Sequence, residues 1–131
     1  MLKVNSTSRL VQTEMTDQFL RWRYTQDFLD FRVVRSGHGV VLIQFRQRGD
    51  CLECSVADSF GLSVSERDRV AVEAARDAEA DYVVRTGLPQ VSQGFIPVPG
   101  FGPRLTWRSI NQEAMPPLAN WDLSTGTVAL F

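Results

Sequence analysis

One stretch, residues 50–86, constrains the fold of this 131-residue chain more than any other. Residues 51–57 alternate as a strand, and residues 63–78 place small apolar side chains at helical spacing. Residues 81–85, with the sequence DYVVR, are expected to form a short buried strand. A strand, a helix and a second strand in this order make a crossover, so the two strands are expected to be parallel. A ligand held by backbone groups is expected where the first strand leads into the helix.

The start of that helix admits two capping registers. Ser65 with Asp68 and Ser63 with Glu66 both have the spacing of a capping box. The free N–H groups of a first helical turn suit a phosphate, but a phosphate loop usually has several glycines, and here Gly61 stands alone. Glu66 and Asp68 would also repel an anion, and both are expected on the solvent side of the helix. A pyrophosphate site and a plain capped helix therefore both remain as interpretations.

Three β-type runs, residues 31–35, 40–47 and 51–57, are separated by tight turns and are expected to form an antiparallel meander. The middle run carries apolar side chains on both faces at one end, which predicts a strand covered on two sides. After Asp58 the alternation is lost, so residues 59–61 are expected to break the strand.

A short helix is expected to begin after Thr16, a suitable N-cap residue. Its segment FLRWRY, residues 19–24, is interpreted as a set of aromatic side chains packed into the core. The alternative, an aromatic and arginine surface that stacks on nucleic-acid bases, lacks a wider basic patch. Residues 1–14 are poorly defined, apart from a short edge strand expected at residues 2–4.

The last third of the chain is interrupted by glycine and proline. A proline in a strand is typical of an edge or a bulge, so any strands here are expected to be short. The expected elements are a helical turn at residues 88–93, strands at residues 95–98 and 105–110, a loop at residues 111–120, and a docked C-terminal strand that includes Trp121 and residues 128–131.

The charge and hydropathy of the chain argue against two classes of partner. The formal net charge is −1, so the basic surface that nucleic-acid binders carry is missing. The longest apolar run, residues 40–43, is far too short to span a bilayer. We therefore expect a cytoplasmic protein that binds neither nucleic acid nor membrane.

Metal and redox chemistry find little support in the sequence. Cys51 and Cys54 lie three apart on a strand and so point to opposite faces, and the chain has a single histidine, His38. That histidine lies in a turn beside Gly37 and Gly39, which can take the positive φ of a hairpin, and it is expected in solvent. Two buried or half-buried thiols are therefore expected rather than a zinc or redox site.

Two carboxylates are candidates for a general base. Glu53 lies on the more polar face of the third β-run, and Asp58 lies at its end. Either would need a pKa raised by burial to act near neutrality, and the alternative is that both are solvated surface groups. A serine or cysteine nucleophile has no histidine base available to it, because His38 lies in a turn.

The order of elements resembles that of a GNAT-type N-acyltransferase without its first strand and helix. The segments that carry the resemblance are FLRWRY at residues 19–24, Gly94-Phe95 after the second parallel strand, and WDLSTG at residues 121–126. In these segments the chain is similar to GNAT-like bacterial proteins, often of two tandem domains, over residues 16–131. The resemblance implies a single α+β domain with a mixed, mostly antiparallel sheet, splayed open between the third β-run and residues 82–85.

The resemblance also implies a function, the transfer of an acyl group, expected to be acetyl, from acetyl-CoA to an amine of a small molecule or peptide. Glu53 or Asp58 would deprotonate the amine. The sequence SFGLSVSERD stands where the family has its phosphate loop. The alternative is a non-catalytic GNAT-like module that acts in protein–protein contact, as a homodimer or as the partner half of a larger acyltransferase. The implied acyl-CoA contacts are the backbone of Val56, Ala57 and Asp58 and the turn of Gly61, Leu62, Ser63, Val64 and Ser65.

Overall fold

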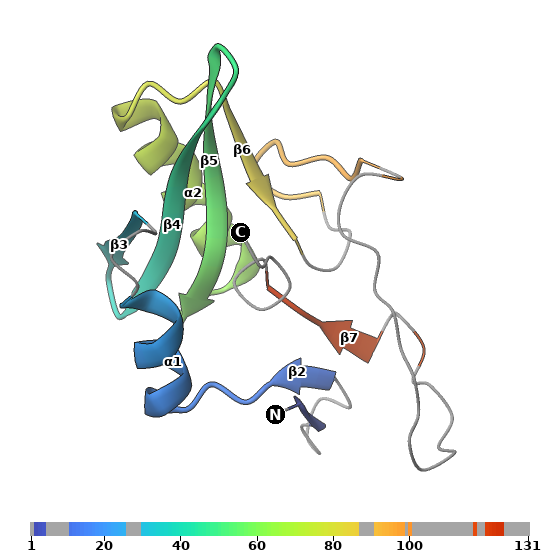
Figure 1. Cartoon of the computed structure of the whole chain (residues 1–131). Helices are drawn as coiled ribbons and strands as arrows, with labels where there is room; N and C mark the ends of the chain where they lie inside the picture. Colours follow the sequence, from blue (N-terminus) through green and yellow to red (C-terminus); the bar gives the residue numbers. More distant parts are fainter. Residues whose placement is uncertain are drawn as a thin grey trace.

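The computed structural model describes residues 2–4, 11–25, 30–86, 91–98, 100, 117 and 120–124, and these form two sheets and two helices (Figure 1). An α+β fold with a mixed sheet, as expected from the sequence, is confirmed. The elements in chain order are β1 (Leu2–Val4), β2 (Val11–Thr13), α1 (Asp17–Tyr24), β3 (Phe31–Ser36), β4 (Gly39–Arg48), β5 (Cys51–Phe60), α2 (Val64–Asp77), β6 (Tyr82–Arg85) and β7 (Trp121–Asp122).

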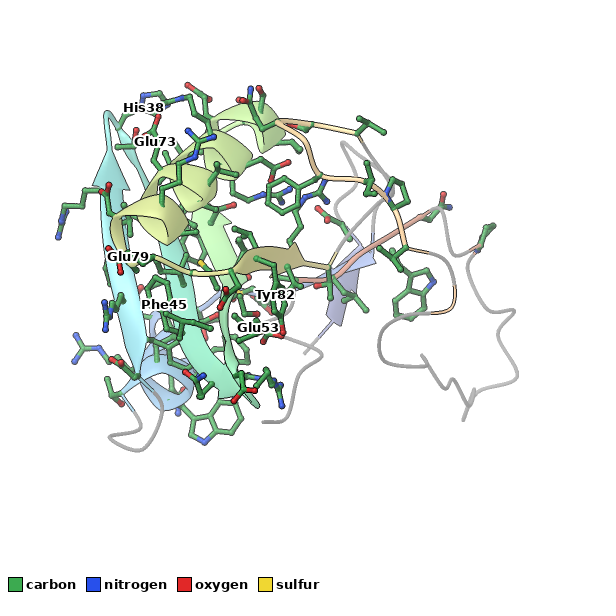
Figure 2. The ribbon with its side chains drawn as sticks, turned by 90° about the horizontal axis from the view of Figure 1, so that it is seen from above. His38, Phe45, Glu53, Glu73, Glu79 and Tyr82 are labelled. Carbon is green, nitrogen blue, oxygen red and sulfur yellow. The ribbon has the colours of Figure 1, made fainter. Side chains whose placement is uncertain are left out.

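The main sheet has the strand order β3-β4-β5-β6. Strands β3, β4 and β5 form the expected antiparallel meander, and β6 pairs with β5 in parallel after the crossover through α2. Helices α1 and α2 lie on opposite sides of this sheet, as the two views together show (Figures 1 and 2). The sheet therefore has an α2 face and an α1 face of different character.

The α2 face carries the apolar core. Small side chains on α2 let the helix backbone lie close to the sheet, and β-branched side chains on β4 and β5 fill the layer between them. Neither helix in the described part of the chain combines the length and apolar character that crossing a bilayer requires. The buried core cluster consists of Val41 and Ile43 on β4, Cys54 and Val56 on β5, and Val70, Ala71 and Ala75 on α2.

The start of α2 adopts the capping register of Ser63 and Glu66. The Ser63 Oγ accepts from the Glu66 N–H at 3.3 Å, and the Glu66 carboxylate accepts from the Ser63 N–H at 2.9 Å. The other register, with Ser65 and Asp68, is wrong, because Asp68 faces the protein interior and is fully buried. A carboxylate at that depth cannot fold back to the helix end.

The smaller sheet has the order β1-β2-β7. The edge strand expected at residues 2–4 is confirmed as β1, antiparallel to β2. Strand β7 pairs in parallel with β2 and places Trp121 in a buried position. The sequence did not predict β2, because three residues are too few for an alternating pattern.

Several expectations from the sequence are wrong. Trp22 is 61% exposed, and Arg23 beside it is the buried residue of α1, so the FLRWRY aromatics are not all in the core. Strand β6 is half exposed rather than buried. Residues 95–98 form no strand, and only an isolated bridge joins Ser92 to Phe95. The expected elements at residues 88–90, 105–110, 128–131 and most of 111–120 lie outside the described residues.

Candidate functional site

The register of β5 shifts by one residue at Ala57. Leu42 pairs with Asp58 and Ile43 pairs with Val56, so Ala57 has no partner in β4, as in a β-bulge. The strand then continues to Phe60, and the expected break at residues 59–61 is wrong. Because of the extra residue, Asp58 lies on the same face of β5 as Glu53, although an odd spacing of five would put them on opposite faces.

The pairing of β5 with β6 ends at the same place. The parallel register runs from Glu53 with Tyr82 to Val56 with Arg85, and β5 extends past the end of β6 (Figure 1). In the described part of the chain, residues 57–60 therefore have no strand on their β6 side. The bulge and the beginning of this edge coincide at Ala57, which is 4% exposed.

Asp58 lies beside the bulge in a buried polar cluster on the α1 face. Tyr24, at the end of α1, donates its hydroxyl hydrogen to Asp58 Oδ2. Ser124, just after β7, forms a second hydrogen bond to the Asp58 carboxyl, and the Arg23 charge lies close by. Both Arg23 and Asp58 are almost completely buried. Three elements far apart in the sequence thus meet at one carboxyl group.

Burial dominates the electrostatics of this cluster. Desolvation raises the pKa of Asp58 above its ordinary value, against the lowering effect of the hydrogen bonds from Ser124 and Tyr24 and of the Arg23 charge. Desolvation and the bond to Asp58 likewise raise the pKa of Tyr24. The phenol therefore stays protonated and continues to donate, while the carboxyl becomes a stronger base than a solvated aspartate. The interpretation of Asp58 as a solvated surface group is wrong.

Glu53 occupies a separate position near the other end of β5. Its carboxylate accepts from the Tyr82 hydroxyl at 3.2 Å and lies 3.8 Å from Arg48 Nε, and Figure 2 shows Glu53 and Tyr82 together beside β6. Asp58 lies five positions further along β5, roughly 15 Å away. The structure therefore does not bring the two candidate bases together.

The turn from β5 into α2 contains the remaining candidate residues. Gly61 has a φ of +70°, and Leu62 packs against Gly39 of the β3–β4 turn. Hydrogen bonds from Ser63 lower the pKa of Glu66, so this carboxylate is ionised at the helix end. The N–H groups of Val64 and Ser65 are in the exposed first turn, with no acceptor among the described residues.

A second buried cluster joins α2 to the end of β6. Asp68 Oδ1 accepts from Arg67 Nε at 2.9 Å and lies 3.2 Å from Arg85 Nε. The Arg85 guanidinium also lies over the Phe95 ring, 5.1 Å from its centre. Asp68 Oδ2 is buried and has no hydrogen-bond partner in the described part of the chain. The expectation of a solvated Asp68 is wrong, since helical periodicity alone does not reveal an arginine on a later strand.

The cysteines and the histidine lie apart from both clusters. Burial and the nearby charge of Glu53 raise the pKa of Cys54 to about 11, so this thiol is protonated and unreactive at neutral pH. Cys51 is exposed, against the expectation of a half-buried thiol. His38 is exposed in its turn, as expected. Within the described ranges, no three histidine, cysteine or acidic residues are grouped as metal ligands.

Sequence reasoning identified Asp58 but not the residues that surround it. Tyr24 was interpreted as one of the aromatic side chains packed into the core, and no spacing in the sequence relates either α1 or Ser124 to β5. The one available signal was that polar residues interrupt β5 between its apolar positions. Neither a protein-family model, nor a curated protein, nor a solved structure matches the chain.

Proposed function

We propose that this chain is a GNAT-type N-acyltransferase domain that transfers an acyl group, in the simplest case acetyl, from coenzyme A to an amine. The observation that carries the proposal is the coincidence at Ala57 of the β5 bulge with the end of β6 pairing. Bulges are frequent beside active sites, because they free backbone groups from the ladder. Freed backbone N–H groups can polarise a thioester carbonyl.

Asp58 supplies the base in this proposal. Its raised pKa makes it a stronger base than a solvated aspartate, and in this proposal the reacting carbonyl lies at the neighbouring bulge. As the amine nitrogen bonds to the acyl carbon, Asp58 takes the proton that the nitrogen loses. The carbon–sulfur bond then breaks, and the departing thiolate takes that proton back from Asp58, so coenzyme A leaves as the thiol. Tyr24 and Ser124 hold the carboxyl by hydrogen bonds. Glu53, bound to Tyr82 and Arg48, is assigned no catalytic part.

The chain fits the two ends of acyl-CoA unequally. The unpaired edge of β5 beyond Val56 suits the amide-bearing pantetheine arm, which can bind as an added strand does. At the start of α2, Val64 and Ser65 offer N–H groups to a phosphate, but the Glu66 carboxylate already binds the Ser63 N–H. The phosphates therefore fit only after Glu66 leaves the cap.

The position of Glu66 also favours a second candidate function, a non-catalytic module that has kept the sheet for protein contact. A carboxylate in the capping position accepts a hydrogen bond at the helix N-terminus and places a negative charge at the positive end of the helix dipole, as a bound phosphate would. In this alternative, the cluster around Asp58 serves only to hold α1 against the sheet.

Binding of acetyl-CoA separates the two functions. Isothermal titration calorimetry is run with the wild-type chain and with Glu66→Gln, which removes the negative charge but keeps the side-chain length. Acetyl-CoA is expected to bind the variant more tightly, and Glu73→Gln, an exposed position later on α2, is the charge-matched control. No binding to either protein at about 1 mM acetyl-CoA, a free energy of only about −4 kcal/mol, would refute the enzyme and leave the module.

Catalysis is tested by release of the coenzyme A thiol with a panel of small amines and peptides. Asp58→Asn is expected to bind acetyl-CoA normally and to lose roughly 10²–10⁴-fold in turnover, the usual contribution of a general base. Glu53→Gln is the control on the same strand face and is expected to retain turnover. A thiol reagent would also label the exposed Cys51, so the assay uses a Cys51→Ser background. Loss of turnover in Glu53→Gln but not in Asp58→Asn would exchange their roles.

A further inference from the structure

The outer edge of β3 is unpaired in the described part of the chain. Strand β3 pairs with β4 and stands at the outside of the main sheet (Figure 1). The two strands are joined by a two-residue turn, so Ser36 and Gly39 form a hydrogen-bonded pair and every second pair does the same. By this alternation the backbone N–H and C=O groups of Phe31, Val33 and Arg35 point away from β4, toward the open edge.

A groove lies beside this edge on the α2 face. Its volume is about 350 Å³, within the range of sites that hold small molecules or peptide side chains. Glu73, exposed on α2, and Phe45, on β4, both line this groove, and both are labelled in Figure 2. The floor is apolar, with Val34, Ile43, Phe45, Val70 and Ala74. The other lining residues are Arg32, Arg35 and Ser36 on β3, Glu73 and Asp77 on α2, and Ala78 at the end of that helix.

The opposite face of the same strand exposes an aliphatic side chain. Val33 is 56% exposed, in the middle of β3. An open ladder edge, an apolar groove on one face and an exposed valine on the other would all be covered by one additional strand, because successive side chains of a strand point to opposite faces. We propose that the outer edge of β3 binds an extended, acidic segment of a partner polypeptide, which adds to the main sheet as a fifth strand.

Charge selects the acidic partner over a second copy of this chain. Arg35, on the same face of β3 as Val33, has no ion-pair partner among the described residues. Arg32, on the groove face, has an exposed contact at 3.5 Å with Asp30, and its guanidinium lies over the Phe45 ring, 4.8 Å from its centre. If two β3 edges paired, the arginines of both strands would lie on one short ladder and repel one another. Charged side chains on an edge strand commonly prevent edge-to-edge pairing in this way. An acidic side chain opposite Arg35 removes that penalty, and apolar neighbours fill the groove and cover Val33.

Hydrogen exchange of individual amides, followed by NMR, tests the free edge first. In dilute protein the amides of Phe31, Val33 and Arg35 are expected to exchange much faster than those of Arg32 and Val34, which bond to β4. If all five are equally protected, another part of this chain covers the edge. If protection of the outer three rises with protein concentration, a second copy does. Either result would overturn the proposal.

A defined probe tests the partner chemistry. A blocked peptide of about eight residues, the length of an ordinary strand, carries alternating valine and threonine with glutamate placed to lie opposite Arg35. It is expected to protect the amides of Val33 and Arg35 and to bind about tenfold more tightly than the same peptide with lysine for glutamate. Arg35→Glu is expected to reverse this preference, whereas Arg21→Glu, exposed on α1 across the sheet, is the charge-matched control.

A proline substitution tests how much the backbone hydrogen bonds of β3 contribute to peptide binding. Proline at position 33 removes an N–H that points to the open edge, so Val33→Pro is expected to keep the β3–β4 ladder and to lose most of the peptide affinity. The intact ladder is checked by the unchanged exchange rate of the Val34 amide. Equal binding to wild type, Arg35→Glu and Val33→Pro, or no amide protection at about 1 mM peptide, would refute the proposal.

Discussion

The buried Asp68 cluster gives the sharpest stability prediction. Asp68 is fully buried, and the Arg85 side chain beside it is 8% exposed. Asp68→Leu removes the carboxylate that lies 3.2 Å from the buried Arg85 guanidinium. Breaking a buried ion pair in this way costs about 3–5 kcal/mol, a large part of the 5–15 kcal/mol that stabilises a typical domain. The variant is therefore expected to be partly unfolded at 37 °C.

A second substitution separates the charge penalty from the loss of packing. In Asp68→Leu with Arg85→Met neither buried charge remains, and the apolar pair replaces the ion pair at similar volume. Arg67 can still reach solvent, because its side chain is 17% exposed. The double variant is therefore expected to recover to within about 1–2 kcal/mol of wild type, so the two substitutions are strongly coupled.

Urea denaturation followed by tryptophan fluorescence measures these free energies of unfolding. Arg69 and Glu73 on the same helix provide the control, since their ion pair, at 2.9 Å, is as close as the 3.2 Å pair of Asp68 with Arg85, but both side chains are about half exposed. Glu73→Leu is expected to cost only about 0.3–0.5 kcal/mol. If Asp68→Leu cost no more than Glu73→Leu, or if adding Arg85→Met gave no recovery, the argument from burial would be wrong.

Three further predictions concern the α1 face and the turns. The pKa of Asp58 is raised in the folded state, so the protonated carboxyl stabilises the fold relative to the ionised one. This contribution is fully present at a pH below the ordinary pKa of 3.8 and is lost as the pH rises through the raised pKa. Asp58→Asn should therefore gain stability relative to wild type from pH 4 upward in urea titrations, and a constant difference would contradict the shift. Tyr24→Phe removes a donor to that carboxyl and is expected to lower the unfolding free energy by about 1.5–3 kcal/mol at neutral pH. Gly39→Ala would place a Cβ 2.4 Å from Leu62 Cγ and is expected to destabilise the fold by about 3 kcal/mol. Gly37→Ala has free space around its Cβ and is expected to cost only about 1 kcal/mol, the cost of an alanine in a left-handed backbone conformation. Equal melting temperatures of the two variants would contradict this.

The reason for a glycine at position 39 lies outside its own turn. The sequence suggested that both turn glycines serve a positive φ, but only Gly37, at +56°, has one. Gly39 is glycine because Leu62 and the Phe60 carbonyl, more than twenty residues later in the chain, occupy the space of a Cβ. No property of the turn alone reveals that contact.

The features that could be predicted from the sequence depend on local pattern. The meander of β3, β4 and β5, the cap of α1 and the parallel return to β6 follow from side-chain period, turn residues and the geometry of a crossover. For α2 the sequence left two capping registers, and the structure has the one with Ser63 and Glu66. Each of these features depends only on residues that lie near one another in the sequence or on a single connection between two elements. The same reasoning identified Asp58 as a candidate base, because it ends a recognisable run.

The chemistry of the site was decided by contacts between distant segments. The single extra residue at Ala57 places Asp58 on the α1 face, and Tyr24 and Ser124 arrive there only through the packing of α1 and β7. The burial of Asp68 likewise depends on Arg85 at the end of β6. Desolvation is a property of the whole assembled surface, so the raised pKa of Asp58 exists only in the folded chain.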